Sequence, residues 1–140
     1  MNWKHGIRKQ ADLKIDCDTH RHNPIQRFNF RLRYVLRYMY WYRSADVRVY
    51  RTKKGFHFYV NMTVKHNFVD KGLVYRARRL EIIFYQLILG SDWLRELRNY
   101  DRAIIHNERD NWNILFSEKD KNGKMQYEKF YCAYRILGSK

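Results

Sequence analysis

The sequence predicts a single α+β domain in which helices cover one face of a β-sheet and leave the other face open. Short segments alternate apolar and polar residues, which is typical of half-buried strands. Between them, apolar residues recur at helical spacing. The chain has 140 residues, 45% of them hydrophobic, which is enough to bury one core. We expect the domain to span residues 11–140, after a flexible basic segment at residues 1–10.

The first strand and the first helix follow each other closely. Leu13, Ile15 and Cys17 alternate with charged residues, which indicates a strand with carboxylates on its polar face. From Ile25 onward the apolar residues recur at helical spacing, and we expect this helix to end at residues 44–46. Its apolar stripe consists of Ile25, Phe28, Leu32, Val35, Leu36 and Met39.

A β-hairpin is predicted after this helix. Residues 47–50 and 56–64 alternate apolar and polar side chains, and Lys53-Lys54-Gly55 supplies the turn. The apolar residues of the second strand form a continuous face, which we expect to be buried against the helices. The polar side chains between them then point to the open side of the sheet.

Two further helices are predicted in the second half of the chain. After a loop at residues 66–72, the first runs from about residue 74 to residue 89 and ends at Gly90. Its inward residues are expected to be Leu80, Ile83, Phe84, Leu87 and Ile88. Ser91 or Asp92 caps the next helix. That helix carries the apolar residues Trp93, Leu94, Leu97 and Ile104.

The last part of the chain predicts an extra C-terminal hairpin. Residues 112–117 and 127–136 are the expected strands, and Asn122-Gly123 is the expected turn. The element order is therefore β-α-β-β-α-α-β-β. Its first part, together with the strand at 112–117, is the split βαβ arrangement of ferredoxin-like and RRM-like folds. In that arrangement the first and third strands lie side by side at the centre of the sheet.

The charge balance favours a polyanionic partner. Lys and Arg number 29 against 14 Asp and Glu, a formal net charge of +15. Such a charge costs folding stability through self-repulsion, so we predict that the chain binds DNA or RNA. There is no long basic helix with a clean apolar face, and the best apolar run, residues 82–89, is broken by Gln86. The sequence therefore does not favour a membrane.

The N-terminus and the cysteines favour a cytoplasmic protein. Residues 1–14 are polar and charged and contain no signal peptide. Cys17 and Cys132 are far apart and lack metal-site spacing, so we expect reduced core thiols. One proline among 12 Tyr, 8 Phe and 4 Trp resembles the composition of small proteins of thermophile viruses and plasmids.

Basic and aromatic side chains supply the candidate nucleic-acid contacts, because cations neutralise phosphates and rings stack on bases. Arg95, Arg98 and Arg102 recur at helical spacing. A solvated helix face paired with Glu96 and Asp101 explains the same pattern equally well. The candidate set is Arg48, Tyr50, Lys53, Lys54, Tyr59, Arg76, Arg79, Arg95, Arg98 and Arg102, with Trp41 as a further stacking residue.

An acidic pair near a histidine is the candidate catalytic site. On the open face, Asp16 and Asp18 of the first strand are expected to lie near His57. Paired carboxylates suit Mg²⁺ or Mn²⁺, and such ions support nucleotidyl transfer and phosphodiester cleavage. His57 would contact a phosphate. The alternative is a solvated acidic strand beside a surface histidine.

The same segments resemble the archaeo-eukaryotic primase family. Residues 13–18, Leu-Lys-Ile-Asp-Cys-Asp, are similar to its Asp-x-Asp strand motif. Residues 52–60 are similar to its strand motif with a nucleotide-contacting histidine, here His57. The resemblance covers residues 11–64 and implies an RRM-type palm domain, with the two aspartates as metal ligands.

The third acidic residue of that family has no counterpart in the expected strand. Residues 113–117 contain no carboxylate, and Glu118 and Asp120 follow only at the end of that strand. The resemblance therefore implies a degenerate site that keeps the scaffold and loses polymerisation.

Two other resemblances compete with it. Residues 54–58 are similar to the start of the RNP1 signature of RNA-recognition motifs, which implies that Phe56 and Phe58 face outward and stack bases. Their continuity with an apolar face favours burial instead. His20-Arg21-His22 has the histidine spacing of rolling-circle replication nucleases, but an arginine stands where an apolar residue is usual.

Three hypotheses follow for the function. The first is a nucleic-acid-binding protein of viral or plasmid replication or processing, with a degenerate primase-like metal site. The second is an active metal-dependent nucleotidyl transferase or nuclease. The third is a viral protein whose charge engages a host factor. The sequence leaves open whether the chain is an enzyme and whether it forms a homodimer.

Overall fold

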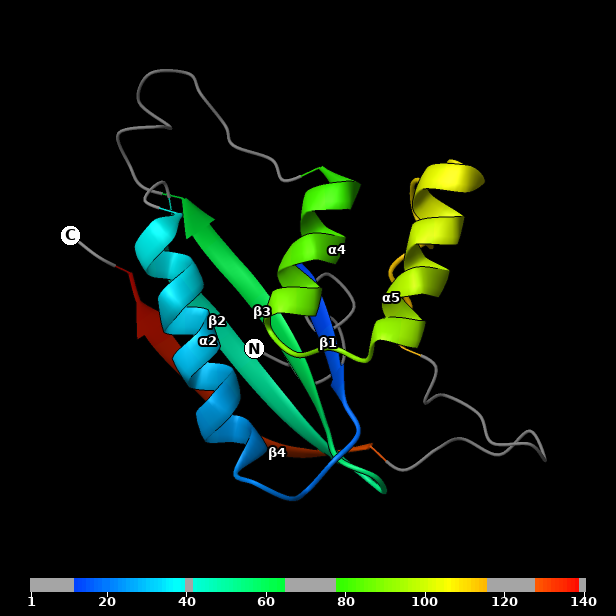
Figure 1. The fold of residues 1–140 in the computed structure, drawn as a ribbon. Helices are drawn as coiled ribbons and strands as arrows, with labels where there is room; N and C mark the ends of the chain where they lie inside the picture. The colour runs from blue at the N-terminus through cyan, green and yellow to red at the C-terminus, as the bar shows by residue number, and fades with distance from the viewer. Residues whose placement is uncertain (1–11, 40–41, 65–77, 116–127, 139–140) are drawn as a thin grey trace.

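The computed structural model describes residues 12–39, 42–64, 78–115 and 128–138. These residues form an α+β fold with a four-stranded antiparallel sheet and three α-helices (Figure 1). The strands are β1 (Leu13–Cys17), β2 (Tyr42–Thr52), β3 (Phe56–Val64) and β4 (Glu128–Leu137). The helices are α2 (Pro24–Tyr38), α4 (Arg79–Ile88) and α5 (Trp93–Tyr100), and a π-helix, Asp101–Ile105, follows α5. The predicted basic segment at 1–10 and the predicted loop at 66–72 lie outside the described residues.

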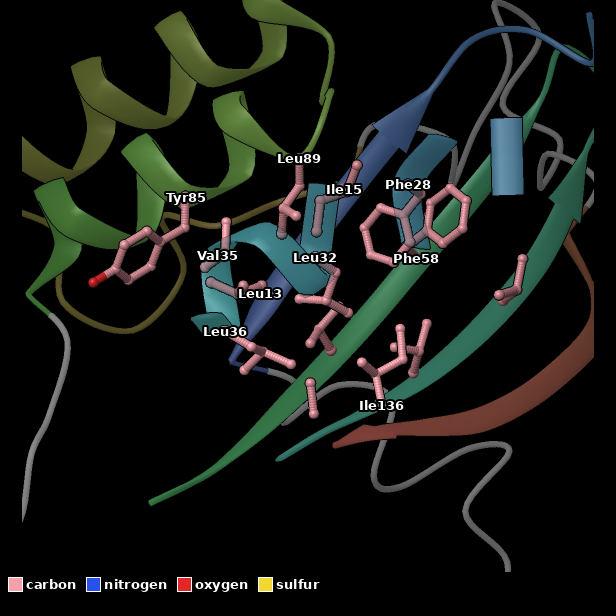
Figure 2. Packing of buried hydrophobic residues seen from close by; sticks show 14 of the residues in the cluster. Leu13, Ile15, Phe28, Leu32, Val35, Leu36, Phe58, Tyr85, Leu89 and Ile136 are labelled. Atoms are coloured by element: carbon pink, nitrogen blue, oxygen red, sulfur yellow. The ribbon is translucent and has the colours of Figure 1, made fainter. Parts of the chain in front are cut away.

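The hydrophobic core lies between the sheet and helices α2 and α4. Phe28 of α2 stacks on Phe58 of β3, with ring centroids 4.0 Å apart (Figure 2). Tyr85 of α4 and Leu89, which follows it, join the same cluster. Phe56 is also buried in this core, so the outward orientation implied by the RNP1 resemblance is wrong. The phase predicted from strand alternation is confirmed.

The turn between β2 and β3 holds the end of β1 in place. The Thr52 N–H donates to the Gly55 carbonyl, and the Gly55 N–H donates to Thr52 Oγ1, both at 2.9 Å. A Cβ on Gly55 would lie 1.8 Å from the carbonyl oxygen of Cys17. Only glycine therefore fits where the hairpin turn passes the end of β1.

The first helix ends earlier than predicted. α2 ends at Tyr38 and β2 begins at Tyr42, before the predicted boundary at residues 44–46. The Tyr42 N–H donates to the Met39 carbonyl at 3.0 Å, which turns the chain. From Ser44 onward the strand pairs with β3 on one side and β4 on the other. Two ladders satisfy the backbone groups of this segment and override its helical pattern.

The strand order is β1-β3-β2-β4, which corrects the predicted sheet in two respects. β1 and β3 are neighbours as expected, but β1 is an edge strand among the described strands and not a central one. Residues 112–115 are irregular where a strand was predicted, and residues 116–117 lie outside the described part. β4 pairs with β2, so it forms no hairpin with residues 112–115.

Side chains from α4, α5 and the segment between them close the outer edge of β1. Gln86 Oε1 accepts the Lys14 N–H at 2.9 Å. Ser91 Oγ accepts the Asp16 N–H at 3.2 Å. The Arg95 guanidinium donates to the Lys14 carbonyl at 2.6 Å. These bonds satisfy the backbone groups that a neighbouring strand would otherwise use, which is why the first strand stays at the edge.

The same packing leaves most of the predicted inward face of α4 exposed. Buried residues of α5 are Arg95, Glu96 and Asn99, all polar. Four of the five residues expected to face inward from α4 are 38–60% exposed, namely Leu80, Phe84, Leu87 and Ile88. The apolar residues of the next helical segment are exposed as well, namely Trp93, Leu94, Leu97 and Ile104. Of the inward set predicted for α4, Ile83 is buried. Polar side chains are needed to bond the β1 edge, so the apolar stripes point away from it.

Candidate functional site

The structure brings two of the three predicted catalytic-site residues together. Asp16 of β1 and His57 of β3 are register partners in their antiparallel pairing. Tyr50 of β2 is the register partner of His57 on the other side. Asp18 follows the end of β1 and is exposed. Asp16 and His57 thus share the sheet face opposite the core.

His57 is buried between two carboxylates. Its Nε2 lies 3.4 Å from Asp16 Oδ1, and its Nδ1 lies 2.7 Å from Glu128 Oε2. The Tyr59 hydroxyl donates to the same Glu128 oxygen at 3.0 Å. We call Asp16, His57, Tyr59 and Glu128 the carboxylate–histidine cluster. It joins β1, β3 and β4 on one face of the sheet.

The surroundings of His57 favour its charged form. Burial lowers its pKa, but the hydrogen bonds and charges of Asp16 and Glu128 outweigh burial and raise the pKa. Burial would raise the pKa of Asp16, but His57 and Arg95 reverse this and leave that pKa lowered. An imidazolium whose two N–H groups both face carboxylates has no lone pair for a proton or a metal ion. In this arrangement His57 links β3 to the carboxylates of Asp16 on β1 and Glu128 on β4.

Glu128 is the member of the cluster that sequence reasoning missed. The primase resemblance implied a third acidic residue in the expected strand at residues 113–117, which contains none. The structure instead pairs Glu128 with Thr52 of β2. This pairing joins segments far apart in the chain, and the only local signal is the position of Glu128 at the start of an alternating segment.

Asp16 and Asp18 stand close together at the end of β1. Their carboxyl groups are within hydrogen-bonding reach of each other. Burial and the negative charge of Asp16 raise the pKa of Asp18. Two adjacent carboxyl groups attract a cation. In residues 12–39, 42–64, 78–115 and 128–138, however, no group of three or more His, Cys, Asp or Glu side chains is arranged to hold a metal ion.

The aromatic residues on this face are covered. Tyr50 and Tyr59 are 2% and 5% exposed and pack edge to face, with ring centroids 5.3 Å apart. Leu115 and Phe130 pack against them. Arg48 is buried too, and its guanidinium carbon lies 5.9 Å from the centre of the Tyr59 ring. The expectation that Arg48, Tyr50 and Tyr59 are exposed on an open sheet face is therefore wrong for this structure, because side chains that include Leu115 and Phe130 cover them.

Arg95 is a core residue and not a surface cation. It is 2% exposed and pairs with the carboxylate of Glu96. Its Nε donates to the Ile114 carbonyl and its Nη2 to Asn113 Oδ1, both at 2.8 Å. The expectation that Arg95 belongs to an exposed basic stripe is therefore wrong. We call the buried polar residues between β1 and the two helices the α4–α5 polar network: Gln86, Ser91, Arg95, Glu96 and Asn99.

The other predicted cations differ in exposure. Arg98 is exposed, whereas Arg79 and Arg102 donate to oxygen acceptors elsewhere in the chain. Arg76 and Trp41 lie outside the described residues. Arg95 is buried, Arg98 is exposed and Arg102 is half-buried, so the three arginines predicted to form one basic stripe do not form an exposed stripe.

Lys53 and Lys54 are exposed at the β2–β3 turn, as predicted. The Nε2 atom of His20 lies 3.2 Å from the carbonyl oxygens of both Thr52 and Lys53. This contact holds the segment before α2 against the turn. The basic turn therefore lies near the segment from which α2 begins.

The exposed side of α2 is a basic and aromatic surface that sequence reasoning did not single out. The helix, PIQRFNFRLRYVLRY, contains four arginines and no acidic residue. Phe30, Tyr34 and Tyr38 are 71%, 56% and 58% exposed. We define the α2 surface as the exposed residues Arg27, Phe30, Arg33, Tyr34, Arg37 and Tyr38. These six residues stand at the helix positions between those of the apolar stripe, and this spacing was the sequence signal that could have predicted the surface.

No helix in the described ranges is long and apolar enough to cross a membrane. No family model, curated protein or solved structure matches the chain. The resemblance to primases thus remains a prediction, and the candidate surfaces rest on their own geometry.

Proposed function

We propose that this protein binds single-stranded nucleic acid through the α2 surface and the neighbouring Lys53-Lys54 turn. The observation that carries the proposal is the exposure of three aromatic rings among three arginines on one helix without acidic residues. Arginines neutralise phosphates, and exposed rings stack on bases. Because stacking needs unpaired bases, a single strand of DNA or RNA suits this surface better than a duplex.

The distribution of charge along the chain argues against the α4–α5 segment as the main contact. Residues 78–110, which contain α4 and α5, carry six arginines and six acidic residues. The remaining residues therefore carry the whole net charge of +15. A phosphate backbone is attracted to the charged part of the chain and not to the neutral part. This argues against Arg98 and Arg102 as the main contacts.

The finer fold class and the biological setting belong to this proposal. An antiparallel sheet with helices packed on one face is compatible with a ferredoxin-like or RRM-like domain whose last strand lies beside β2. A degenerate primase-like site in viral or plasmid replication is compatible with a His57 that has both nitrogens occupied by Asp16 and Glu128. Engagement of a host factor stays a prediction.

The test measures the affinity for a labelled oligonucleotide as a function of salt. Arg33→Gln with Arg37→Gln removes two exposed charges from α2. The slope of log affinity against log salt should then fall by about 1.4, since each phosphate contact to a single strand contributes about 0.7. Arg98→Gln with Arg109→Gln is the matched control, which removes the same charge from the neutral segment and should leave the slope unchanged.

Two results would contradict the proposal. Equal loss of affinity in both double variants would mean that net charge alone matters. Tighter binding to duplex than to single strand would rule out the stacking role of Phe30, Tyr34 and Tyr38. Replacing Tyr34 by alanine should weaken single-strand binding by about 1–3 kcal/mol if its ring stacks on a base.

A second candidate function is Mg²⁺- or Mn²⁺-dependent nucleotidyl transfer or phosphodiester cleavage at Asp16 and Asp18. The observation in its favour is the adjacency of the two carboxyl groups, one of them exposed. Mn²⁺ titration followed by calorimetry tests for the ion, and incorporation and cleavage assays test for the reaction. Asp16→Asn with Asp18→Asn should abolish both. Unchanged activity in this double variant would remove the two residues from any mechanism.

A further inference from the structure

Helices α4 and α5 present a continuous apolar face to solvent. Trp93 and Leu97 of α5 are 64% and 55% exposed, and Phe84 of α4 is 60% exposed. The two helices form a groove of about 720 Å³, lined mainly by Leu80, Phe84, Leu87, Trp93, Leu97 and Tyr100. Several large apolar side chains exposed around one groove are typical of an interaction site.

The side of α4 and α5 that faces the sheet explains why burial of their solvent-facing side would stabilise them. The α4–α5 polar network faces the sheet and bonds the edge of β1. Helix α4 buries Ile83 and Tyr85 beside this network, whereas α5 buries only polar side chains and exposes its apolar ones. An amphipathic helix gains most of its stability from burying its apolar face. Helix α5 therefore gains little apolar burial from its own sheet, and its apolar side is free to be buried by another surface.

We propose that a second copy of this chain covers the face, so that α4 and α5 of two copies pack as four helices about a two-fold axis. Six apolar side chains that line the groove are between 38% and 64% exposed: Leu80, Phe84, Leu87, Trp93, Leu97 and Tyr100. Ile88, Leu94 and Ile104, on the same helices and the following π-helix, are between 38% and 48% exposed. An aromatic side chain buries roughly 150–250 Å² and an aliphatic one somewhat less, so covering the exposed half of these nine residues would bury roughly 600–900 Å². A standard stable interface buries about 800 Å² per partner.

The local charge also favours a second copy. Two chains of net charge +15 repel each other over most of their surfaces. The segment 78–110 is the exception, because its six arginines and six acidic residues cancel. Joining two copies there places neutral surfaces in contact and keeps the basic regions apart. A strongly acidic partner would instead be drawn to the basic parts of the chain.

The position of this face leaves the α2 surface accessible. Figure 1 shows α5 on the far side of α4 from α2. A two-fold interface uses the same patch on both copies, so both α2 helices would remain exposed in the dimer. The dimer does not depend on nucleic-acid binding for its argument, and it would give two binding helices per assembly.

The test is the mass of the nucleic-acid-free protein by sedimentation equilibrium over a wide concentration range, in low salt and in 1 M salt. The expected result is a mass twice the 17.5 kDa of the chain in both salts, since apolar contacts resist added salt. Phe84→Glu with Leu97→Glu should give a monomer. Phe30→Glu, which places a charge on a similarly exposed helix position outside the face, should stay dimeric.

A second measurement, of distances between the two copies, tests the interface without the double glutamate variant and so does not depend on whether that variant folds. Spin labels at Arg98→Cys, in a chain with Cys17→Ser and Cys132→Ser, should give a short distance between copies by pulsed electron resonance. Labels at Arg33→Cys on α2 should give a longer distance. A wild-type monomer at every concentration overturns the proposal, as does a dimer that persists in the double glutamate variant or shows the shorter distance at α2.

Discussion

Replacing Glu96 by glutamine should destabilise the fold strongly although it changes only one atom. Glu96 Oε1 accepts hydrogen bonds from Gln86 at 2.7 Å and from Asn99 at 3.1 Å. Its Oε2 accepts from the Ser91 hydroxyl at 2.7 Å and from the Arg95 guanidinium. All four partners donate, so a glutamine amide must turn its NH₂ group toward donors in either orientation.

The neighbours cannot reorient to accept from the new amide. The Gln86 oxygen already accepts the Lys14 N–H, and the Asn99 oxygen accepts from Arg102. The variant therefore loses at least one buried hydrogen bond and leaves the Arg95 charge without its closest carboxylate. Breaking a buried ion pair by removing one partner costs about 3–5 kcal/mol. That is a large part of the roughly 5–15 kcal/mol that stabilises a typical domain.

The assay is urea unfolding followed by circular dichroism. Asp46→Asn is the matched control, because Asp46 pairs with Arg135 at 2.7 Å on the surface, with both side chains largely exposed. Such a pair contributes at most about 1 kcal/mol. If Glu96→Gln lowers the free energy of unfolding by no more than Asp46→Asn does, the buried hydrogen bonds of Glu96 do not stabilise the fold as proposed. Arg95→Gln combined with Glu96→Gln should cost less than the sum of the single changes, because the two residues are coupled.

Three further outcomes are expected. Because the pKa of His57 is raised in the fold, the charged imidazole stabilises the protein fully below its usual pKa of 6.5, and this stabilisation is lost as pH rises through the raised pKa. The free energy of unfolding measured in urea should therefore fall above about pH 6.5. Glu128→Gln should make this pH dependence weaker. Gly55→Ala should lower the melting temperature by the equivalent of about 1–3 kcal/mol or more, because the new Cβ meets the Cys17 carbonyl oxygen at 1.8 Å; a melting temperature like that of the wild type would contradict this contact. Leu115→Ala should lower the free energy of unfolding in urea by about 2–5 kcal/mol. A loss no larger than that caused by Leu137→Ala, at an exposed leucine, would show that Leu115 does not cover the tyrosines.

Local patterns were sufficient to predict most of the elements. Alternation located β1 and β3 and assigned the buried side of β3 correctly, because the period of two fixes which residues share a face. Glycine and lysine at residues 53–55 located the turn. Asp92 was one of the two predicted caps of α5, and its carboxylate accepts the Arg95 N–H at 3.2 Å.

Helical periodicity did not predict the buried side of α4. It correctly shows that Leu80, Phe84 and Leu87 share a face, but it does not show whether that face points to the sheet or to solvent. The direction is set by Gln86 and Ser91, whose side chains bond the edge of β1. Contacts of this kind join segments more than seventy residues apart, so no local pattern contains them.

The same limit of local patterns explains which residues of the carboxylate–histidine cluster could be predicted. Asp16 and His57 were placed together correctly because the pairing of their strands follows from the element order. Glu128 could not be placed, because the pairing of β4 with β2 depends on which edge of the sheet stays available. With α4 and α5 at the β1 edge, the last strand pairs with β2, and this places the Glu128 carboxylate 2.7 Å from Nδ1 of His57.

The closure of the β1 edge by polar side chains therefore has consequences on both sides of the molecule. It directs the apolar residues of α4 and α5 outward, where they form a neutral face suited to self-association. It also leaves α2 as the exposed helix with a concentrated positive charge, beside the basic turn. Assembly and nucleic-acid binding would then use separate surfaces of opposite salt sensitivity. Raising the salt concentration should release an oligonucleotide from the dimer while the dimer itself persists, which is a behaviour that a single shared surface cannot produce.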